Sequence, residues 1–339
     1  MNSSTNTALR AIALGTLAAA GCFFDEYADE PTPVQTPTGA GNSNQEPDDT
    51  GTNTNNNNNG GDEPEEFDIV SLDPRLYRIV STRTLDSDGA DMGRSAYDLI
   101  REFGGPSPIE APDLYEENHP GVPHIYEEFA PLIGDHFVFT IHRDIDIDRD
   151  KTEITDRQRN EIKTYASSED AVKGYEGQTF LYRWKFQINA DMEVSTRFSH
   201  FFQLKAVGGE DSQPIITISG AERSGEDGIE VRYSPLRDTT LLDRQPWSEV
   251  TGEWVEVYCR ATFAEVGEFR MLAVRMSDNK VILDIDEAEL DLWRGLDPDD
   301  FVRPKWGIYR SILDAENLRP DEEIVRFANF SVERLELLD

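Results

Sequence analysis

The chain has 339 residues, with 67 acidic against 32 basic side chains, and its formal net charge is −35. This balance argues against a nucleic-acid-binding protein, because contacts to phosphates need a basic surface. It also argues against docking on an anionic membrane through a polybasic patch. Hydrophobic residues make up 37% of the chain and aromatic residues 10%, which suffices for a packed core over most of the length.

The first residues have the pattern of a secretory signal. Arg10 precedes a short apolar stretch, and small residues follow it up to Cys22. The stretch is too short to span a bilayer as a helix, so residues 1–21 are predicted to be a signal peptide. The sequence Leu-Ala-Ala-Ala-Gly-Cys that ends at Cys22 resembles a bacterial lipobox. This implies a lipoprotein of the cell envelope, anchored through Cys22; cleavage to a free extracellular product is the alternative.

Residues 22–66 are predicted to be a disordered tether. The segment is rich in Pro, Thr, Gly and Asn, and from Asp25 to Glu66 it holds 11 acids and no Lys or Arg. Such a composition cannot bury enough apolar surface to offset its chain entropy. With these 11 acids and one base lying before Phe67, residues 67–339 carry a net charge of −25 and are predicted to form one β domain.

The domain is predicted to begin with one helix and to continue as strands. The helix covers Ser95–Phe103 and is closed by two glycines, and a proline-rich stretch follows it. After Gly134 the apolar residues alternate with period two. The candidate strands are Phe137–Arg143, Arg157–Tyr165, Thr179–Ile188, Ser195–Lys205, Ile215–Ser219, Gly228–Ser234, Trp254–Phe263, Gly267–Met276, Lys280–Ile285, Trp306–Ile312 and Glu323–Leu337. Many short strands separated by turns predict an all-β jelly roll of two antiparallel sheets.

Alternation along four of these strands separates a core side from a polar side. The residues predicted on the polar side are His142, Arg157, Arg159, Glu161, Lys163, Tyr165, Gln203, Lys205, Lys305 and Tyr309. If these sides converge, they form a cleft with several cations and one carboxylate; a solvated outer face is the alternative. His200 alternates with Phe202 and is interpreted as a core histidine. His119 and His124 lie in the proline-rich stretch and are given no role.

Three segments then resemble a known family. Residues 156–165 are similar to the Arg-x-Glu-x-Arg/Lys strand of alginate lyases, and residues 303–311 to their Lys-x-Gly-x-Tyr strand. Residues 202–205, Phe-Gln-Leu-Lys, are similar to their Gln-x-His strand, with Lys205 in the place of the histidine. In this order they resemble the jelly-roll polysaccharide lyases, in particular the heparin lyase I and glucuronan lyase group, over roughly His136 to Asp339.

The resemblance implies an exported lyase that removes the C5 proton of a uronic acid and expels the 4-linked sugar. Gln203 would contact the uronate carboxyl, and with Arg159 it would offset the charge that develops there. His142 stands where glucuronan lyases have their catalytic histidine, and it is predicted to be the base. Tyr309 is the predicted acid; Tyr309 as both acid and base is the alternative. The predicted substrate-binding residues are Arg159, Glu161, Lys163, Lys205 and Lys305.

Other sites and functions are weighed against this interpretation. The loop Asp144–Asp150 fails the EF-hand pattern, because Arg149 replaces the glycine, so a solvated acidic loop is preferred to a bound Ca²⁺. No zinc spacing or nucleotide fingerprint occurs, and neither a metal nor a cofactor is predicted. The alternatives to the lyase are a non-catalytic carbohydrate-binding jelly roll and a glycoside hydrolase. The expected partner is an anionic polysaccharide, the expected membrane contact is the lipid anchor alone, and the expected state is a monomer.

Overall fold

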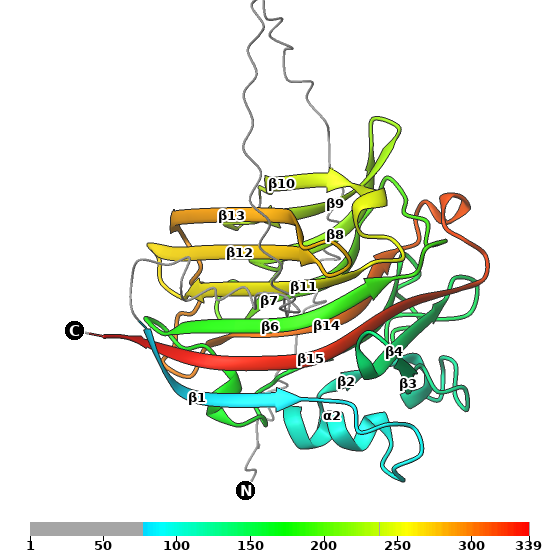
Figure 1. The fold of residues 1–339 in the computed structure, drawn as a ribbon, viewed down its shortest axis with the longest axis horizontal. Coiled ribbons are helices and arrows are strands. Elements are labelled where there is room, and N and C mark those ends of the chain that lie inside the picture. The colour runs from blue at the N-terminus through cyan, green and yellow to red at the C-terminus, as the bar shows by residue number, and fades with distance from the viewer. Residues whose placement is uncertain (1–76, 237, 339) are drawn as a thin grey trace, which may run out of the picture. The chain divides into compact units, whose positions relative to one another are not determined.

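The computed structural model describes residues 77–236 and 238–338, which form two antiparallel sheets packed face to face (Figure 1). The eight-stranded sheet runs, in spatial order, β13 (Lys280–Leu290), β12 (Gly267–Arg275), β11 (Trp254–Thr262), β6 (Thr179–Ile188), β15 (Glu322–Leu337), β4 (Gly134–His142) and β3 (Ile125–Ala130), and β1 (Tyr77–Leu85) also pairs with β15. The seven-stranded sheet runs β10 (Thr240–Pro246), β9 (Glu226–Tyr233), β8 (Ile216–Arg223), β7 (Ser199–Val207), β14 (Phe301–Ser311), β5 (Arg157–Lys163) and β2 (Ile109–Glu110).

This architecture confirms the predicted all-β jelly roll, and every predicted strand has a counterpart. Sequence reasoning missed β1, β2, β3 and β10. The signal peptide, Cys22 and the tether lie outside the described residues, so their assignments stay predictions. Among the residues described, no helix is long and apolar enough to cross a membrane.

The predicted helix is α2 (Ala96–Gly104), and its start follows from local chemistry. The Ser95 side chain accepts a hydrogen bond from the Asp98 backbone, and the Asp98 side chain accepts one from the Ser95 backbone, which is a capping box. The helix buries an apolar face that includes Leu99, Ile100 and Phe103. Short 3₁₀ turns connect other elements: η1 (Pro112–Leu114), η2 (Asp170–Val172), η3 (Trp247–Glu249) and η4 (Ala315–Asn317).

The core lies between the sheets and fixes which side of β14 is polar. Trp306 of β14 packs against Trp184 of β6, with ring centroids 6.0 Å apart, and both side chains are almost fully buried. Because alternate residues of a strand point to opposite sides, Lys305 and Tyr309 face away from this core. We call that side of the seven-stranded sheet the polar face.

Candidate functional site

Three adjacent strands carry the predicted site. β14 lies between β5 and β7, so residues that are far apart in the chain become direct neighbours. Tyr309 of β14 is opposite Arg159 of β5 and opposite His200 of β7, and Lys305 is opposite Gln203. Strand order and register therefore bring these four predicted polar-side residues onto one face, and they add His200, which was not predicted there.

Glu161 is the point at which the polar face converges. Its carboxylate accepts hydrogen bonds from Arg159 Nη1 and from Lys305 Nζ, each at 2.5 Å. Gln203 Nε2 also donates to it. All four side chains are buried or nearly so, which strengthens charge-assisted hydrogen bonds by excluding water. The sequence placed these residues in one cleft, and the structure places them in mutual contact.

Tyr309 lies beside this cluster, with cations on its ring and on its hydroxyl. The Arg159 guanidinium lies 3.7 Å from the ring centroid, and Lys305 Nζ lies 6.0 Å from it. Arg157 Nη1 donates a hydrogen bond of 3.1 Å to Tyr309 Oη. The Arg157 hydrogen bond fixes the position of the Tyr309 hydroxyl at the edge of the cluster.

His200 is not a core histidine, contrary to the sequence interpretation. Phe201 and Phe202 both belong to the hydrophobic core, and the pairing of β7 with β8 shifts register between His200 and Phe202. This bulge turns His200 to the polar face, where its ring centroid lies 5.9 Å from that of Tyr309. Its Nδ1 lies 2.7 Å from Ser219 Oγ. Burial, and then the cations of the polar face, lower the pKa of His200 to about 3.

The irregularity on β14 falls at Gly307. The pairing of β14 with β7 shifts register between Trp306 and Tyr309, and Gly307 has a φ of +139° there. A Cβ at this position would lie 2.2 Å from the backbone oxygen of Asn160. Only glycine fits this close approach, so Gly307 is what allows β14 to pair with β5 without a register shift.

Two carboxylates that sequence reasoning did not assign complete the ion network. Glu110 of β2 lies 2.6 Å from Lys163 Nζ and 2.8 Å from Lys305 Nζ. Burial alone would raise the pKa of Glu110, but Lys305, Arg159 and Lys163 hold it well below its usual range. Asp148 accepts a 2.7 Å hydrogen bond from Arg159 Nε. Likewise its pKa is lowered, because Arg159 and Arg149 outweigh burial.

Lys205 differs from the other predicted cations in its partner. Arg157, Arg159, Lys163 and Lys305 each contact a carboxylate. In contrast, Lys205 Nζ donates to the backbone carbonyl of Asp211 at 2.5 Å. Burial, followed by the neighbouring charge of Lys305, lowers the pKa of Lys205 to about 8. The Lys205 ammonium is thus bonded to a neutral carbonyl and not to a carboxylate.

His142 lies elsewhere, although it was predicted to share the cleft with Gln203 and Tyr309. It ends β4 in the other sheet, and its Nδ1 lies 3.2 Å from Asp146 and 3.3 Å from His124 Nε2. Its backbone carbonyl accepts from Gln158, which alternates with Arg157 and Arg159 and so points away from the polar face. The structure thus separates the predicted base from the predicted acid.

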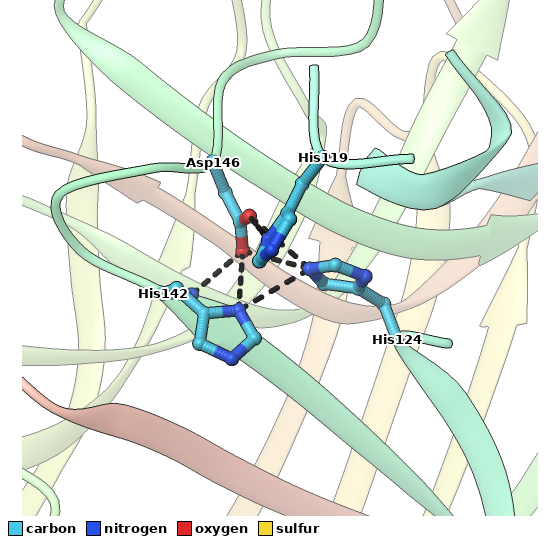
Figure 2. A group of neighbouring side chains, drawn as sticks. All are labelled: His119, His124, His142 and Asp146. Carbon is cyan, nitrogen blue, oxygen red and sulfur yellow. Dashed lines mark hydrogen bonds and ion pairs between the residues drawn. The ribbon is translucent and has the colours of Figure 1, made fainter. Parts of the chain in front are cut away.

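The side chains around His142 form a compact cluster (Figure 2). His119, His124, His142 and Asp146 point toward one another, and their nearest ligand atoms all lie within 4.8 Å of each other. Sequence analysis assigned no role to His119 and His124. The signal in the sequence was the grouping of four of the five histidines between residues 119 and 142.

The acidic loop that follows β4 was predicted to be solvated, but two of its carboxylates are buried. Asp146 and Asp148 are 2% and 1% exposed. Asp146 belongs to the histidine cluster, whereas Asp148 binds Arg159 of the polar face. Both carboxylates therefore contact side chains of the domain.

No protein-family model matches the chain, and no curated protein sequence matches it. Its structure resembles solved structures of polysaccharide lyases. For endo-β-1,4-glucuronan lyase from the fungus Trichoderma reesei the identity is 14% and the TM-score 0.43, over 67% of this chain and 93% of that chain. For a mutant of alginate lyase Aly36B in complex with alginate trisaccharide, the identity is 9% and the TM-score 0.48, over 77% of this chain and 100% of that chain. For the alginate lyase from Aplysia kurodai, the identity is 9% and the TM-score 0.47, over 75% of this chain and 98% of that chain.

Proposed function

We propose that this protein is an exported polysaccharide lyase that cuts a uronic-acid polymer by β-elimination on the polar face. The observation that carries the proposal is the convergence of Gln203, Arg159 and Lys305 on one carboxylate, beside Tyr309 and His200. An amide and two cations arranged in this way can hold a carboxylate, and the two adjacent side chains can each transfer a proton.

The reaction needs charge compensation first. The C5 proton of a uronate is a poor acid while the neighbouring carboxylate keeps its charge, so donors must stabilise the enolate-like state as it forms. Gln203 and Lys205 lie on β7, two residues apart on the same face, and would receive the substrate carboxylate. Glu161 would orient Gln203 and Arg159, since it is bonded to both.

Proton transfer falls to His200 and Tyr309. We assign His200 as the base, because its low pKa keeps the imidazole neutral at working pH. A bound uronate would offset the surrounding cations and make the imidazole more basic. The C5 proton moves to His200, the C4–C5 double bond forms, the C4–O bond breaks, and Tyr309 protonates the leaving oxygen. Solvent then returns the proton from His200 to Tyr309.

A glycoside hydrolase fits the polar face less well. Hydrolysis by two carboxyl groups requires one of them to be protonated at working pH, which needs a raised pKa. Glu110 and Asp148 have lowered pKa values because they are paired with Lys305 and Arg159 respectively. Neither therefore fits the role of general acid, and the third carboxylate, Glu161, is occupied by hydrogen bonds from Arg159, Gln203 and Lys305.

The proposed function is tested by incubating the protein with glucuronan, alginate and heparin. Cleavage by elimination should give an unsaturated product that absorbs in the ultraviolet, with at least one of the three polymers. New reducing ends without that absorbance would instead indicate hydrolysis. If the polymers bind without being cut, the protein is a carbohydrate-binding module on the same fold.

Lys205 gives the proposal a pH signature. An ammonium is charged below its pKa and neutral above it, so Lys205 loses its charge as the pH rises through about 8. We therefore expect KM for an anionic polymer to rise between about pH 7 and 9, with little change in kcat. In a Lys205→Arg variant this rise should disappear, because arginine stays charged over that range. An unchanged pH profile in the variant would exclude Lys205 as the group responsible.

A further inference from the structure

The histidine cluster at the end of β4 has the composition of a metal site. His119 comes from the loop before β3, His124 immediately precedes that strand, His142 ends β4, and Asp146 lies in the loop after it. We propose that these four residues bind one divalent transition-metal ion of the zinc class. The inference concerns a different cluster from the polar face and does not depend on the proposed lyase activity.

Hydrogen bonds outside the cluster fix the orientation of two imidazoles. His124 Nδ1 lies 2.6 Å from the Val122 carbonyl, which can only accept, so this nitrogen carries the proton. His142 Nε2 lies 3.2 Å from the carboxylate of Glu322 and carries its proton for the same reason. With an ion bound, each imidazole would keep its single proton on this outer nitrogen, so His124 Nε2 and His142 Nδ1 would present lone pairs to the centre of the cluster. Outer acceptors of this kind accompany metal-bound histidines.

The spacing of the inward-facing atoms fits a single bound ion. His124 Nε2 and His142 Nδ1 face each other at 3.3 Å, and both lie within 3.2 Å of the Asp146 carboxylate. His119 Nδ1 lies 2.8 Å from the same carboxylate. Two ligands bound to zinc at about 2.0–2.1 Å in tetrahedral geometry are about 3.3 Å apart, so the spacing matches one edge of a tetrahedron.

The donor set selects the class of ion. Three imidazoles and one carboxylate suit Zn²⁺ and its transition-metal neighbours, whereas Ca²⁺ and Mg²⁺ prefer oxygen ligands alone. The side chains of His124 and Asp146 are fully buried, and those of His119 and His142 are 17% and 20% exposed. The cluster is thus largely dry but open to solvent on one side, through which an ion can enter.

The ion would also brace the proposed catalytic face. Asp146 and Asp148 lie two residues apart on one loop, and Asp148 holds Arg159 through Nε. The Gln158 side chain, from the same strand as Arg159, donates to the backbone oxygen of Asp146. Fixing Asp146 to a metal would therefore fix the segment that positions Arg159. This gives the ion a structural role, with no part in the elimination step.

The test uses the full chain, stripped with a chelator and then dialysed against Zn²⁺ alone. We expect one zinc per chain by elemental analysis. At a free zinc concentration of about 100 times Kd, the melting temperature should rise by roughly 5 °C. His119→Ala and His142→Ala should each weaken zinc binding by more than about 100-fold, since loss of an outer partner alone costs about 10–100-fold. Ca²⁺ at the same concentration should give no shift.

Asp144→Asn is the matched control, because Asp144 belongs to the same loop but is 63% exposed and pairs with Arg143. It should bind zinc as the unaltered chain does. The proposal is overturned if the stripped chain takes up no zinc, or if both histidine variants retain it with unchanged affinity. In either case the cluster is stabilised by hydrogen bonds between the histidines and Asp146, without a metal ion.

Discussion

A Tyr309→Phe variant is expected to lose roughly 100- to 10,000-fold in kcat for uronate elimination, the range observed when one proton-transfer group is removed. The substitution keeps the ring that packs under Arg159 and removes only the hydroxyl that accepts from Arg157. Gln203, Lys205 and Glu161 are untouched, so KM should change little. The measurement is the initial rate of unsaturated product on whichever polymer is cut, over a range of substrate concentrations.

Tyr175→Phe provides the matched control. Its hydroxyl donates to Asp170 at 2.9 Å in an exposed pair, and its ring packs against Phe301 at the other end of β14 from Tyr309. Removing that hydroxyl should leave kcat within about twofold, since surface changes of this kind have small effects. A Tyr309→Phe variant that keeps full activity would show that another group protonates the leaving oxygen. A parallel rise in KM would instead indicate that the hydroxyl mainly binds substrate.

The positions on β5 and β14 were predictable because both strands keep strict alternation over the residues that matter. Arg159, Glu161 and Lys163 follow one another at period two, and so do Lys305, Gly307 and Tyr309. Burial of the opposite side, led by Trp306, fixes the direction of the polar face. Where one side of a strand packs in a core and no bulge interrupts the strand, the pattern is enough to orient its side chains.

His200 could not be placed by the same reasoning, because alternation fails within its strand. A bulge adds one residue, so two consecutive phenylalanines enter the core and all residues before them change sides. Nothing in the run Ser-His-Phe-Phe-Gln marks that position. The pairing of β7 with β8 is set by partners outside the strand, and that information is absent from a single sequence.

The histidine cluster was missed for a different reason. Its ligands come from a loop, two strand ends and a second loop, so their spacing matches no local motif. Only the pairing of β3 with β4 brings His124 beside His142. Glu110 was missed for the same reason, because its two-residue strand is too short to show a pattern. Its side chain reaches Lys163 only because β2 pairs with β5.

Glu161→Gln is expected to destabilise the domain by about 3 kcal/mol at neutral pH. Removing one partner of a buried ion pair costs about 3–5 kcal/mol, because the remaining charge stays desolvated. We expect the lower end of that range, since Lys305 retains Glu110 and Arg159 retains Asp148. The free energy of unfolding can be measured by urea denaturation. Glu336→Gln is the control: its pair with Arg78 is exposed, with side chains 47% and 63% accessible, so the loss should stay below about 1 kcal/mol.

Glu110→Gln extends this test to the shared cation. Glu110 and Glu161 both contact Lys305, so each carboxylate compensates for loss of the other. The double variant leaves the Lys305 ammonium buried without either partner, and its destabilisation should exceed the sum of the single losses by about 1 kcal/mol or more. Additive losses would mean that Lys305 regains solvent or deprotonates when Glu161 is neutralised. In that case the ion pairs of the polar face contribute to stability independently of one another. The Glu110→Gln substitution would then leave substrate binding at Gln203 unchanged.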